Sequence, residues 1–593
     1  MNQEGNNTNT EEYLHFLEEV MQAVSENWND STPVHAILRE NLDKLDFQFA
    51  EILQTWATEK IEKATRFQAE SIAINLRNFS IDLFDFPLGN RANNIEIAII
   101  CLEIRSQVFT RENSPERWAN TQESFGNYYS NRIKGEKKEN LENAISCYQT
   151  ALQIHTRDAF PQDWANIQGN LGNAYQDRIK GEKKENLENA IACYQDTLQV
   201  CTRDAFPQYW ANTQKSLGIA YRNRIKGEKK ENLENAIACF QAALQIHTRD
   251  VFPQDWARTQ IGLGIAYFYR IQGERNKNLE KTIVAFQAAS QVLTHEAFPQ
   301  DWAMLQHNLG EAYIERIRGE RGKNLEEAIA ILKTALEVRT RDAFPENWAM
   351  TKDNLGVAYL NRIQGEREDN LETAINYHQQ ALEIFTRESF PENFAQAQTN
   401  LGTAFKAQFD ELGNLEDLTR AITAYKQAVS IYQDGAYGSE PLAQVLYRLG
   451  FALMQQGSYS QAISTLERAR VLQSQRKDII GLATTLFTLA GVYHRTNYFQ
   501  EARLYFKESL RLFRRLQEPK KIAAVLTSLG NVEMQLLRFD CARDHLEEAR
   551  TYYDSHNNAP RLAEVNKLLN WIEEELENVN SQSLQSDPAK VGS

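Results

Sequence analysis

The sequence predicts an all-α protein in which helix hairpins repeat along the chain and stack into a solenoid. The first observation is an aromatic series at intervals of 46 residues: Trp118, Trp164, Trp210, Trp256, Trp302, Trp348 and Phe394. The second is that Leu-Gly pairs and four cysteines keep the same interval. The third is a pair of helical apolar stripes inside each interval. One supersecondary unit is therefore copied along the sequence.

Residues 163–208 illustrate how one period is expected to fold. Apolar residues recur at helical spacing from Trp164 to Tyr175, and Gly181 follows the last turn of this first helix. After the charged bend GEKKEN, a second apolar stripe continues until shortly before Pro207. Proline cannot continue a helix and biases the preceding residue toward extended geometry. The Phe-Pro pair is therefore expected to turn the chain into the next hairpin.

Two recurring features have a packing explanation. The glycine of each Leu-Gly pair lets two helix axes approach while an aromatic side chain fills the space around it. An arginine column is expected to brace neighbouring helices through nearby carboxylates, and its members are Arg132, Arg178, Arg224, Arg270, Arg316 and Arg362. Both features repeat in phase, which indicates architecture.

The phase of the repeats predicts the domain boundaries. The 46-residue register already holds near residue 67, and eight long units follow. Later Leu-Gly and Leu-Ala pairs, at 449, 489 and 529, are 40 residues apart, which predicts three shorter units. The predicted segments are a disordered tail at 1–10, a helical lead-in at 11–66, long repeats at 67–420, the end of the eighth repeat with three short units at 421–558, a capping helix at 559–578 and a disordered tail at 579–593. Within the lead-in, helical apolar spacing predicts helices over 11–27 and 47–63.

The spacing Leu-Gly-x-x-Tyr followed by Ala-x-x-x-aromatic-x-x-Ala resembles the tetratricopeptide repeat (TPR), for example at Leu309, Gly310 and Tyr313 with Ala328 and Ala335. The resemblance implies a right-handed α-solenoid. The familiar unit has about 34 residues, so these units are longer.

Phrases such as DWANIQGNLGNAYQDRIKGE and TRDAFPQ look like the long TPR arrays of filamentous cyanobacteria. Many of those relatives carry a caspase-like CHAT protease domain. That chemistry needs a His-Gly segment and a downstream cysteine nucleophile. This sequence has no His-Gly pair, and its late cysteine, Cys541, lies inside a repeat helix. Protease activity is therefore not expected.

Charge and hydropathy exclude several partners. The formal net charge of -15 argues against a nucleic-acid or anionic-membrane surface, because either partner would be repelled. The longest strongly apolar stretch, near residues 95–104, is too short to span a bilayer, and the first ten residues do not resemble a signal region. A cytoplasmic location is the expectation.

The sequence spacing of the cysteines and histidines indicates whether they could form a catalytic pair or a metal site. His155, Cys201 and His247 share one column, and a Cys/His pair can activate a thiolate. Stacked helices of adjacent units lie roughly 10 Å apart, too far for the required hydrogen bond. The same distance argues against a metal site in the cysteine column. No catalytic residue, metal or cofactor is predicted.

Function is expected where the repeats differ, because a recognition surface must present different groups along its length. The resemblance places the first helices along a concave groove, and Asn170, Asn308, Asn354 and Asn400 stand just before the Leu-Gly pairs. A side-chain amide offers both donor and acceptor to a peptide group. We therefore expect these residues to hold a peptide backbone. The alternative is that they only cap or bridge neighbouring helices.

One repeat has an unusually apolar first helix. Ile261, Ile265, Phe268 and Tyr269, with Arg258 nearby, are predicted to form an exposed contact site. The alternative is that superhelical curvature or the N-terminal lead-in covers them.

These features predict a non-enzymatic scaffold that binds a peptide or protein segment in its concave groove. An alternative is a regulatory sensor arm that acts in trans on a separate effector such as a caspase-like protease. An enzyme in its own right is the weakest hypothesis. Array ends sometimes pair, so self-association through them stays open.

Overall fold

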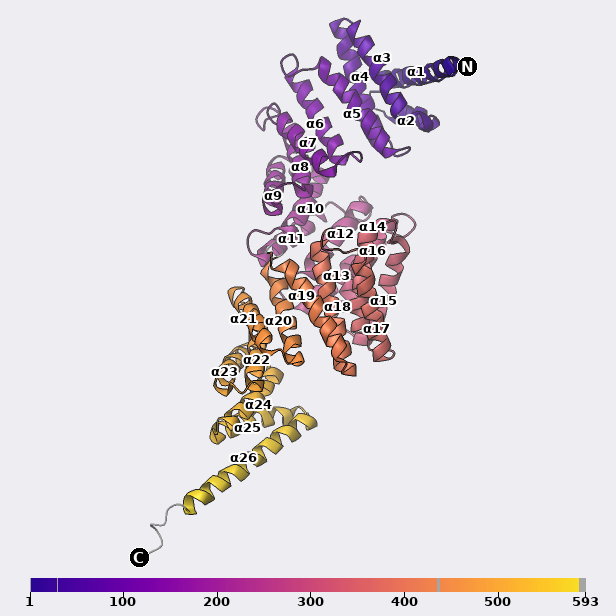
Figure 1. Ribbon diagram of the computed structural model, residues 1–593. Helices are drawn as coiled ribbons and strands as arrows, with labels where there is room; N and C mark the ends of the chain where they lie inside the picture. The colour runs from indigo at the N-terminus through magenta and orange to yellow at the C-terminus, as the bar shows by residue number, and fades with distance from the viewer. Residues whose placement is uncertain (1, 29, 435–437, 586–593) are drawn as a thin grey trace, which may run out of the picture. The chain divides into compact units, whose positions relative to one another are not determined.

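The computed structural model describes residues 2–28, 30–434 and 438–585, and every regular element in those ranges is helical. The chain divides into two compact units, Met1–Phe298 and Pro299–Ser593, which we call the N-terminal and C-terminal units. Each unit consists mainly of helix hairpins stacked side by side (Figure 1). The predicted all-α array of TPR-like hairpins is confirmed.

In the N-terminal unit, three α-helices and one 3-10 helix precede five long hairpins, α4/α5 to α12/α13. The elements are α1 (Asn2–Glu26), α2 (Thr32–Glu40), η1 (Leu42–Lys44), α3 (Phe47–Glu62), α4 (Arg66–Asp85), α5 (Arg91–Val108), α6 (Pro115–Asn131), α7 (Lys137–Ala151), α8 (Pro161–Asp177), α9 (Lys183–Val200), α10 (Pro207–Asn223), α11 (Lys229–Ala243), α12 (Pro253–Phe268) and α13 (Arg275–Ser290).

In the C-terminal unit, three long hairpins, α14/α15 to α18/α19, are followed by three short ones, α20/α21 to α24/α25. The elements are α14 (Pro299–Glu315), α15 (Arg321–Val338), α16 (Pro345–Leu360), α17 (Arg367–Leu382), α18 (Pro391–Leu412), α19 (Leu415–Tyr432), α20 (Ser439–Gln456), α21 (Tyr459–Gln475), α22 (Ile479–Arg495), α23 (Phe499–Leu516), α24 (Pro519–Gln535), α25 (Phe539–Ser555) and α26 (Ala559–Gln585).

The bend inside each long hairpin from α4/α5 to α16/α17 is closed by a glycine and an asparagine. In the hairpin α8/α9, Gly181 has φ +82°, a left-handed conformation that glycine adopts without strain. The side-chain nitrogen of Asn186 donates hydrogen bonds to the carbonyl oxygens of Arg178 and Lys180, at 3.3 and 2.9 Å. The short hairpins lack this insertion, and the bend of each contains one residue in the left-handed region: Gly457, Asn497 or Leu537.

The predicted arginine braces are present. Arg178 at the end of α8 donates two hydrogen bonds, both of 2.7 Å, to the carboxylate of Glu142 in the preceding hairpin. This bidentate geometry holds adjacent hairpins in register. The same pairing recurs within the described residues as Arg132–Glu96, Arg224–Glu188, Arg270–Glu234 and Arg362–Glu326.

The Leu-Gly glycines are packing residues, as predicted. A β-carbon added at Gly172 would lie 2.7 Å from the Tyr194 ring of the partner helix, so no larger residue fits without displacing that ring. The Cβ positions of Gly450 and Gly530 in the short hairpins meet Leu466 and Leu546 at 2.5 and 2.7 Å. Close approach of the two helices in a hairpin therefore depends on glycine.

The lead-in packs against the first long hairpin through aromatic rings. Phe16 of α1 contacts Phe49 of α3 at 4.9 Å between ring centres, and Phe49 contacts Phe79 of α4 at 6.3 Å. Helices α1 and α3 correspond to those expected over 11–27 and 47–63, whereas α2 was not predicted, and α1 already begins at Asn2, inside the stretch expected to be a disordered tail. At the other end α26 continues to Gln585, and residues 586–593 of the predicted tail lie outside the described residues. The domain boundaries themselves stay predictions.

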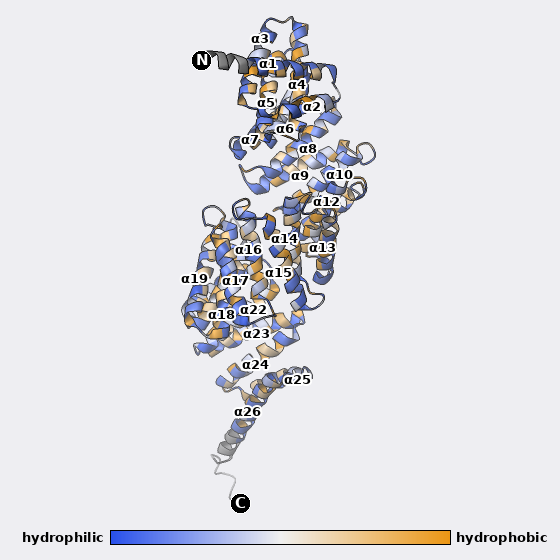
Figure 2. Cartoon of the chain, turned by 90° about the vertical axis from the view of Figure 1, so that its right-hand side faces the viewer, coloured by the Kyte–Doolittle hydropathy of each residue, from blue (hydrophilic) through white to orange (hydrophobic). Residues whose placement is uncertain are grey.

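Hydrophobic residues are interleaved with polar ones along the helices of the described chain (Figure 2). None of the described helices is long and apolar enough to cross a membrane.

Candidate functional site

The first helices of successive hairpins carry a variable column, which is the position two residues before each Leu-Gly or equivalent pair. The Leu-Gly pair recurs with little change, whereas this position changes chemistry from repeat to repeat. Its members are Arg77, Glu123, Gly169, Lys215, Ile261, His307, Asp353, Thr399, Tyr447, Phe487 and Thr527. The column identifies the part of each repeat that is free to take on function.

In the long repeats, three polar members of this column, Lys215, His307 and Asp353, are bonded to neighbouring repeats. Lys215 pairs with Asp255 of α12 at 2.7 Å. His307 shares a hydrogen bond of 3.1 Å with the Thr351 hydroxyl, which also accepts one from Arg339 at 3.3 Å. Burial, with a smaller contribution from Arg339, lowers the pKa of His307 to about 3, so this imidazole is neutral at physiological pH.

Asp353 completes a second such group. One of its carboxylate oxygens lies 2.6 Å from His378 Nδ1, and the other accepts a hydrogen bond from Asn400 at 2.8 Å. The His378 side chain is fully buried and Asp353 is nearly so. The inner side of these long repeats is therefore largely a self-satisfied polar network.

The predicted asparagines take part in these networks. Asn170 donates to Asn127 at 3.0 Å, Asn354 lies 3.4 Å from His307 Nε2, and Asn400 bonds Asp353. Each link joins first helices of adjacent repeats, the arrangement that the bridging alternative describes. Asn308 is half-buried at the equivalent position of α14. Binding of a peptide backbone by these four residues stays a prediction.

The expectation of an exposed apolar cluster on α12 is wrong for two residues. Ile261 and Phe268 are only 4% and 8% exposed, Ile265 is half-buried, and Tyr269 and Arg258 are exposed. The reason is that α12 contacts α10, α11 and α13, so most of its circumference is covered. The Phe268 ring packs edge-on against Tyr269 and lies under the Arg275 guanidinium at 4.8 Å.

The cysteine and histidine column offers no activated thiolate in the part of the chain that the structure describes. Cys201 is 1% exposed, and burial raises the pKa of its thiol. His247 Nδ1 shares a hydrogen bond of 3.1 Å with the Thr259 hydroxyl, and His155 is fully buried. The described residues also contain no group of three or more His, Cys, Asp or Glu side chains that could hold a metal ion.

The short repeats differ, because aromatic members of the variable column line open space. Two adjoining cavities of about 240 and 250 Å³ lie along the first helices α20, α22 and α24. Both are lined by Phe451, Phe487 and Thr488, so we treat them as one surface, the aromatic groove. The remaining lining residues are Tyr447, Met454, Thr484, Gly491, His494, Arg495, Phe506, Phe513, Lys521, Ala524, Val525, Ser528 and Asn531.

The polar groups of the groove are few. The hydroxyls of Thr484, Thr488 and Ser528 donate to carbonyl oxygens one turn back in their own helices, at 2.8 to 3.1 Å. They therefore present little hydrogen-bonding capacity to a ligand. Asn531 contributes a side-chain amide with both donor and acceptor atoms. Burial lowers the pKa of His494, which keeps this imidazole neutral at physiological pH.

Gly491 is the most informative residue of the groove. It follows Leu489-Ala490 in the middle of α22, where glycine costs up to about 1 kcal/mol relative to alanine. A β-carbon added there would meet no atom within 4 Å, unlike one added at Gly450 or Gly530. Helix packing therefore does not require this glycine, and its missing side chain leaves space in the groove.

Sequence analysis missed this groove although a signal was present. Phe451, Gly491 and Asn531 occupy one column at the 40-residue interval, directly after the Leu-Gly or Leu-Ala pairs, and all three line the second cavity. These three residues differ in chemistry, and one of them is a glycine inside a helix. Such a column indicates a position that the packing of the repeats does not determine.

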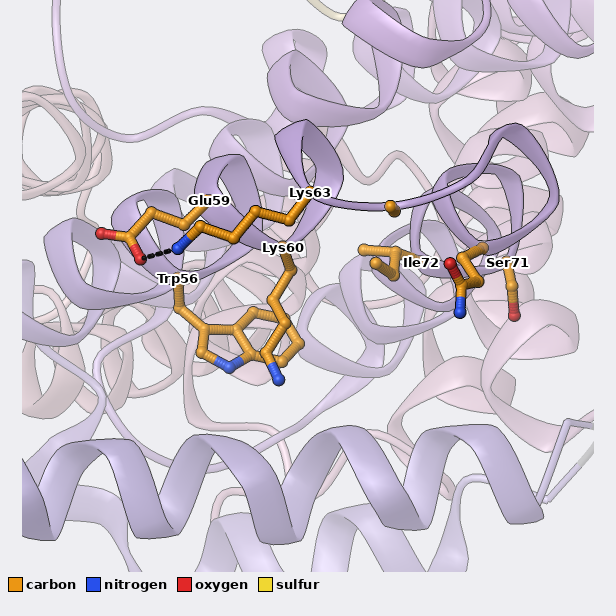
Figure 3. A pocket seen from close by; sticks show the side chains of 8 residues that line it. Trp56, Glu59, Lys60, Lys63, Ser71 and Ile72 are labelled. Carbon is orange, nitrogen blue, oxygen red and sulfur yellow. Dashed lines mark hydrogen bonds and ion pairs between the residues drawn. The ribbon is translucent and has the colours of Figure 1, made fainter.

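A further cavity, of about 610 Å³, is less suited to recognition. It lies between α3 and α4 of the lead-in, where Trp56 and Lys60 lie side by side (Figure 3). The Lys60 ammonium is 5.8 Å from the centre of the Trp56 ring, and Lys63 pairs with Glu59 at 3.3 Å. Most of the lining side chains are exposed, so the cavity is a surface depression whose cations already have neighbours.

Comparison with known proteins places the groove residues of α20, α22 and α23 within a recognised repeat. Residues 441–515 match the family model of the tetratricopeptide repeat. No curated protein matches the chain. The family match, together with the first of the solved structures described next, supports a TPR array.

Three solved structures are similar in fold, each with 14% sequence identity. A signal-transduction ATPase of the STAND class with a tetratricopeptide repeat sensor, from Pyrococcus horikoshii, has a TM-score of 0.51, and the match covers 88% of this chain and 74% of that one. A Rap protein complexed with competence and sporulation factor has a TM-score of 0.41, covering 70% and 99%. The anaphase-promoting complex hetero-tetramer Cut9–Hcn1 has a TM-score of 0.36, covering 87% and 98%.

Proposed function

We propose that this chain is a protein-interaction scaffold whose aromatic groove binds an extended peptide or protein segment. The observation that carries the proposal is Gly491. A helix-interior glycine lowers helix stability, and here no close packing offsets that cost. What the glycine provides is space beside Phe451 and Phe487, large enough for a ligand side chain.

The surroundings of that space fit an apolar anchor. Phe487 and Phe506 lie 5.6 Å apart, and Tyr447 stacks near Phe451 at 6.4 Å between ring centres. Partly buried aromatic surface with an open cavity is the usual form of an energetically dominant contact. The scaffold acts by recognition alone, without catalysis. A sensor arm acting on a separate protease draws no support from a specific observation in the described residues, so we do not develop it.

The proposal is tested with a random twelve-residue peptide display library selected against the full chain. We expect the wild-type protein to enrich a family of peptides and Gly491→Leu, which fills the cavity, to lose them. Gly413→Leu is the matched control, because a β-carbon at Gly413 also meets no atom within 4 Å but lies in the bend between α18 and α19. That position is left-handed, so Gly413→Asn serves as a second control with less strain.

Circular dichroism establishes that each variant keeps its helicity. Absence of any enriched peptide would contradict the proposal. So would equal enrichment by the wild-type protein and a folded Gly491→Leu variant, because the peptides would then bind elsewhere.

A further inference from the structure

The aromatic groove carries positive charge without a carboxylate. Its lining includes Lys521 and Arg495 and no aspartate or glutamate, although the whole chain has a net charge of -15. The one acidic residue of α24, Glu533, is already paired with cations. Glu533 is fully buried and bonded to Arg503 at 2.8 Å and to Arg538 at 3.2 Å. The charge of the groove is therefore opposite in sign to that of the molecule.

Aromatic rings hold one of these cations at the groove. The Lys521 ammonium lies 5.3 Å from the centre of the Phe513 ring, an arrangement in which the ring face attracts the cation. Lys406 of α18 lies 5.3 Å from the Phe451 ring, but it also pairs with Asp410. Lys521 is half-buried beside apolar surface, where attraction to a ligand carboxylate is stronger than in bulk water.

The two lining cations lie at opposite ends of the parallel first helices. Lys521 is in the first turn of α24 and corresponds to Gly481 of α22 at the 40-residue interval, whereas Arg495 ends α22. With a rise of 1.5 Å per residue, the two positions are separated by about 20 Å along the helix axes. An extended peptide covers that distance in about six residues.

We infer that the segment bound in the aromatic groove is acidic and apolar: a large apolar side chain enters the space beside Gly491, and carboxylates about six residues apart flank it and pair with Lys521 and Arg495. This inference rests on the proposed function. The Asn531 amide bonds the backbone of the segment between the two carboxylates. A basic segment is excluded by repulsion at both ends.

The sequences of the selected library peptides are the first test. Enriched peptides are expected to carry two Asp or Glu residues, four to seven positions apart, on either side of an aromatic or large aliphatic residue. One such peptide is then synthesised with a fluorescent label, together with versions in which both acids are Asn or both are Lys. The Asn version is expected to bind about tenfold more weakly, and the Lys version to lose detectable binding.

Charge reversal in the protein is the second test. The double variant Lys521→Glu with Arg495→Glu is expected to lose the acidic peptide by at least tenfold and to gain affinity for the Lys version. Lys520→Glu is the matched control, because Lys520 is exposed next to Lys521 but does not line the groove. It is expected to change affinity by less than twofold.

The outcomes separate the two proposals. Peptides that depend on Gly491 but are basic, or show no charge preference, would overturn the acidic ligand and leave the scaffold function standing. An acidic peptide whose affinity is unchanged in the folded double variant would do the same. If no peptide is enriched, the proposed function fails, and the acidic ligand fails with it.

Discussion

The long and the short repeats use the same variable column in opposite ways. In the long repeats the column carries Lys215, His307 and Asp353, and each is bonded to a side chain of a neighbouring helix. In the short repeats it carries Tyr447 and Phe487, which line open cavities. A varied side chain is therefore not in itself a binding residue. Variation in the long repeats specifies which repeat packs next to which, whereas variation in the short repeats leaves surface for a ligand.

The glycines of the short repeats provide the strongest contrast. Gly450→Leu places side-chain atoms where a β-carbon alone would lie 2.5 Å from Leu466, and it is expected to destabilise the hairpin α20/α21 by about 3 kcal/mol. Gly491→Leu meets open space and is expected not to destabilise the helix, and replacing glycine raises helix propensity by up to about 1 kcal/mol. Amide hydrogen exchange across residues 439–535 measures both effects locally. Equal destabilisation by the two substitutions would mean that Gly491 is a packing residue.

The polar network of the long repeats is tested at Asp353. Asp353→Ala leaves His378 buried without its carboxylate partner and removes the acceptor of Asn400, so we expect a loss of about 2 kcal/mol. Asp353→Asn keeps an acceptor of the same shape and is expected to cost less. Urea unfolding followed by circular dichroism, with hydrogen exchange across α16 to α18, measures the change. If Asp353→Ala left the free energy of unfolding unchanged, this residue would belong to a binding surface instead.

Glu123 extends the test to pH. Burial, and next the charge of Asp163, raise the pKa of Glu123 to about 7, while Arg77 partly opposes the shift. The folded state therefore holds this proton more tightly than the unfolded chain, and stability falls as pH rises from about 4.5 to 7. Glu123→Gln is expected to stabilise the protein by about 1 to 2 kcal/mol at pH 8 and not at pH 4. Melting temperatures of both proteins at the two pH values decide this, and a gain that is independent of pH would contradict the burial of an ionisable Glu123.

The smallest expected effect tests whether Gly491 leaves space for a ligand or is required for helix packing. Gly491→Ala adds one methyl group to a helix interior where no atom lies within 4 Å. It is expected to raise the stability of α22 by about 0.5 to 1 kcal/mol and, at the same time, to weaken peptide binding. Stability and binding would then change in opposite directions, which a purely structural glycine does not allow. Hydrogen exchange and titration with a labelled peptide give the two values.

Local features of the fold were predictable because they depend on residues close together in sequence. The first helices begin at the prolines that follow phenylalanine, and the bends close at the glycines that the register singled out. Boundaries in the lead-in were less predictable, and α2 was missed because its nine residues are fewer than the window over which helical periodicity is recognised. The role of the arginine column was predicted correctly. Each of these arginines has a glutamate at the same sequence separation in the preceding hairpin, so the same ion pair forms from repeat to repeat.

The candidate site was less predictable for a physical reason. Exposure of Ile261 or Phe268 depends on which side chains of α10, α11 and α13 reach α12, and those belong to other repeats. Asn400 offers the same amide whether it meets a ligand or Asp353, and only the fold brings that carboxylate within 2.8 Å. The sequence alone determined the repeat, its two periods and the helix hairpin, because periodic apolar burial requires nothing beyond neighbouring repeats. Tertiary structure decided which variable side chains form hydrogen bonds or ion pairs with one another. It also decided which side chains, around Gly491, line open space where a ligand can bind. Both depend on distances between residues of different hairpins.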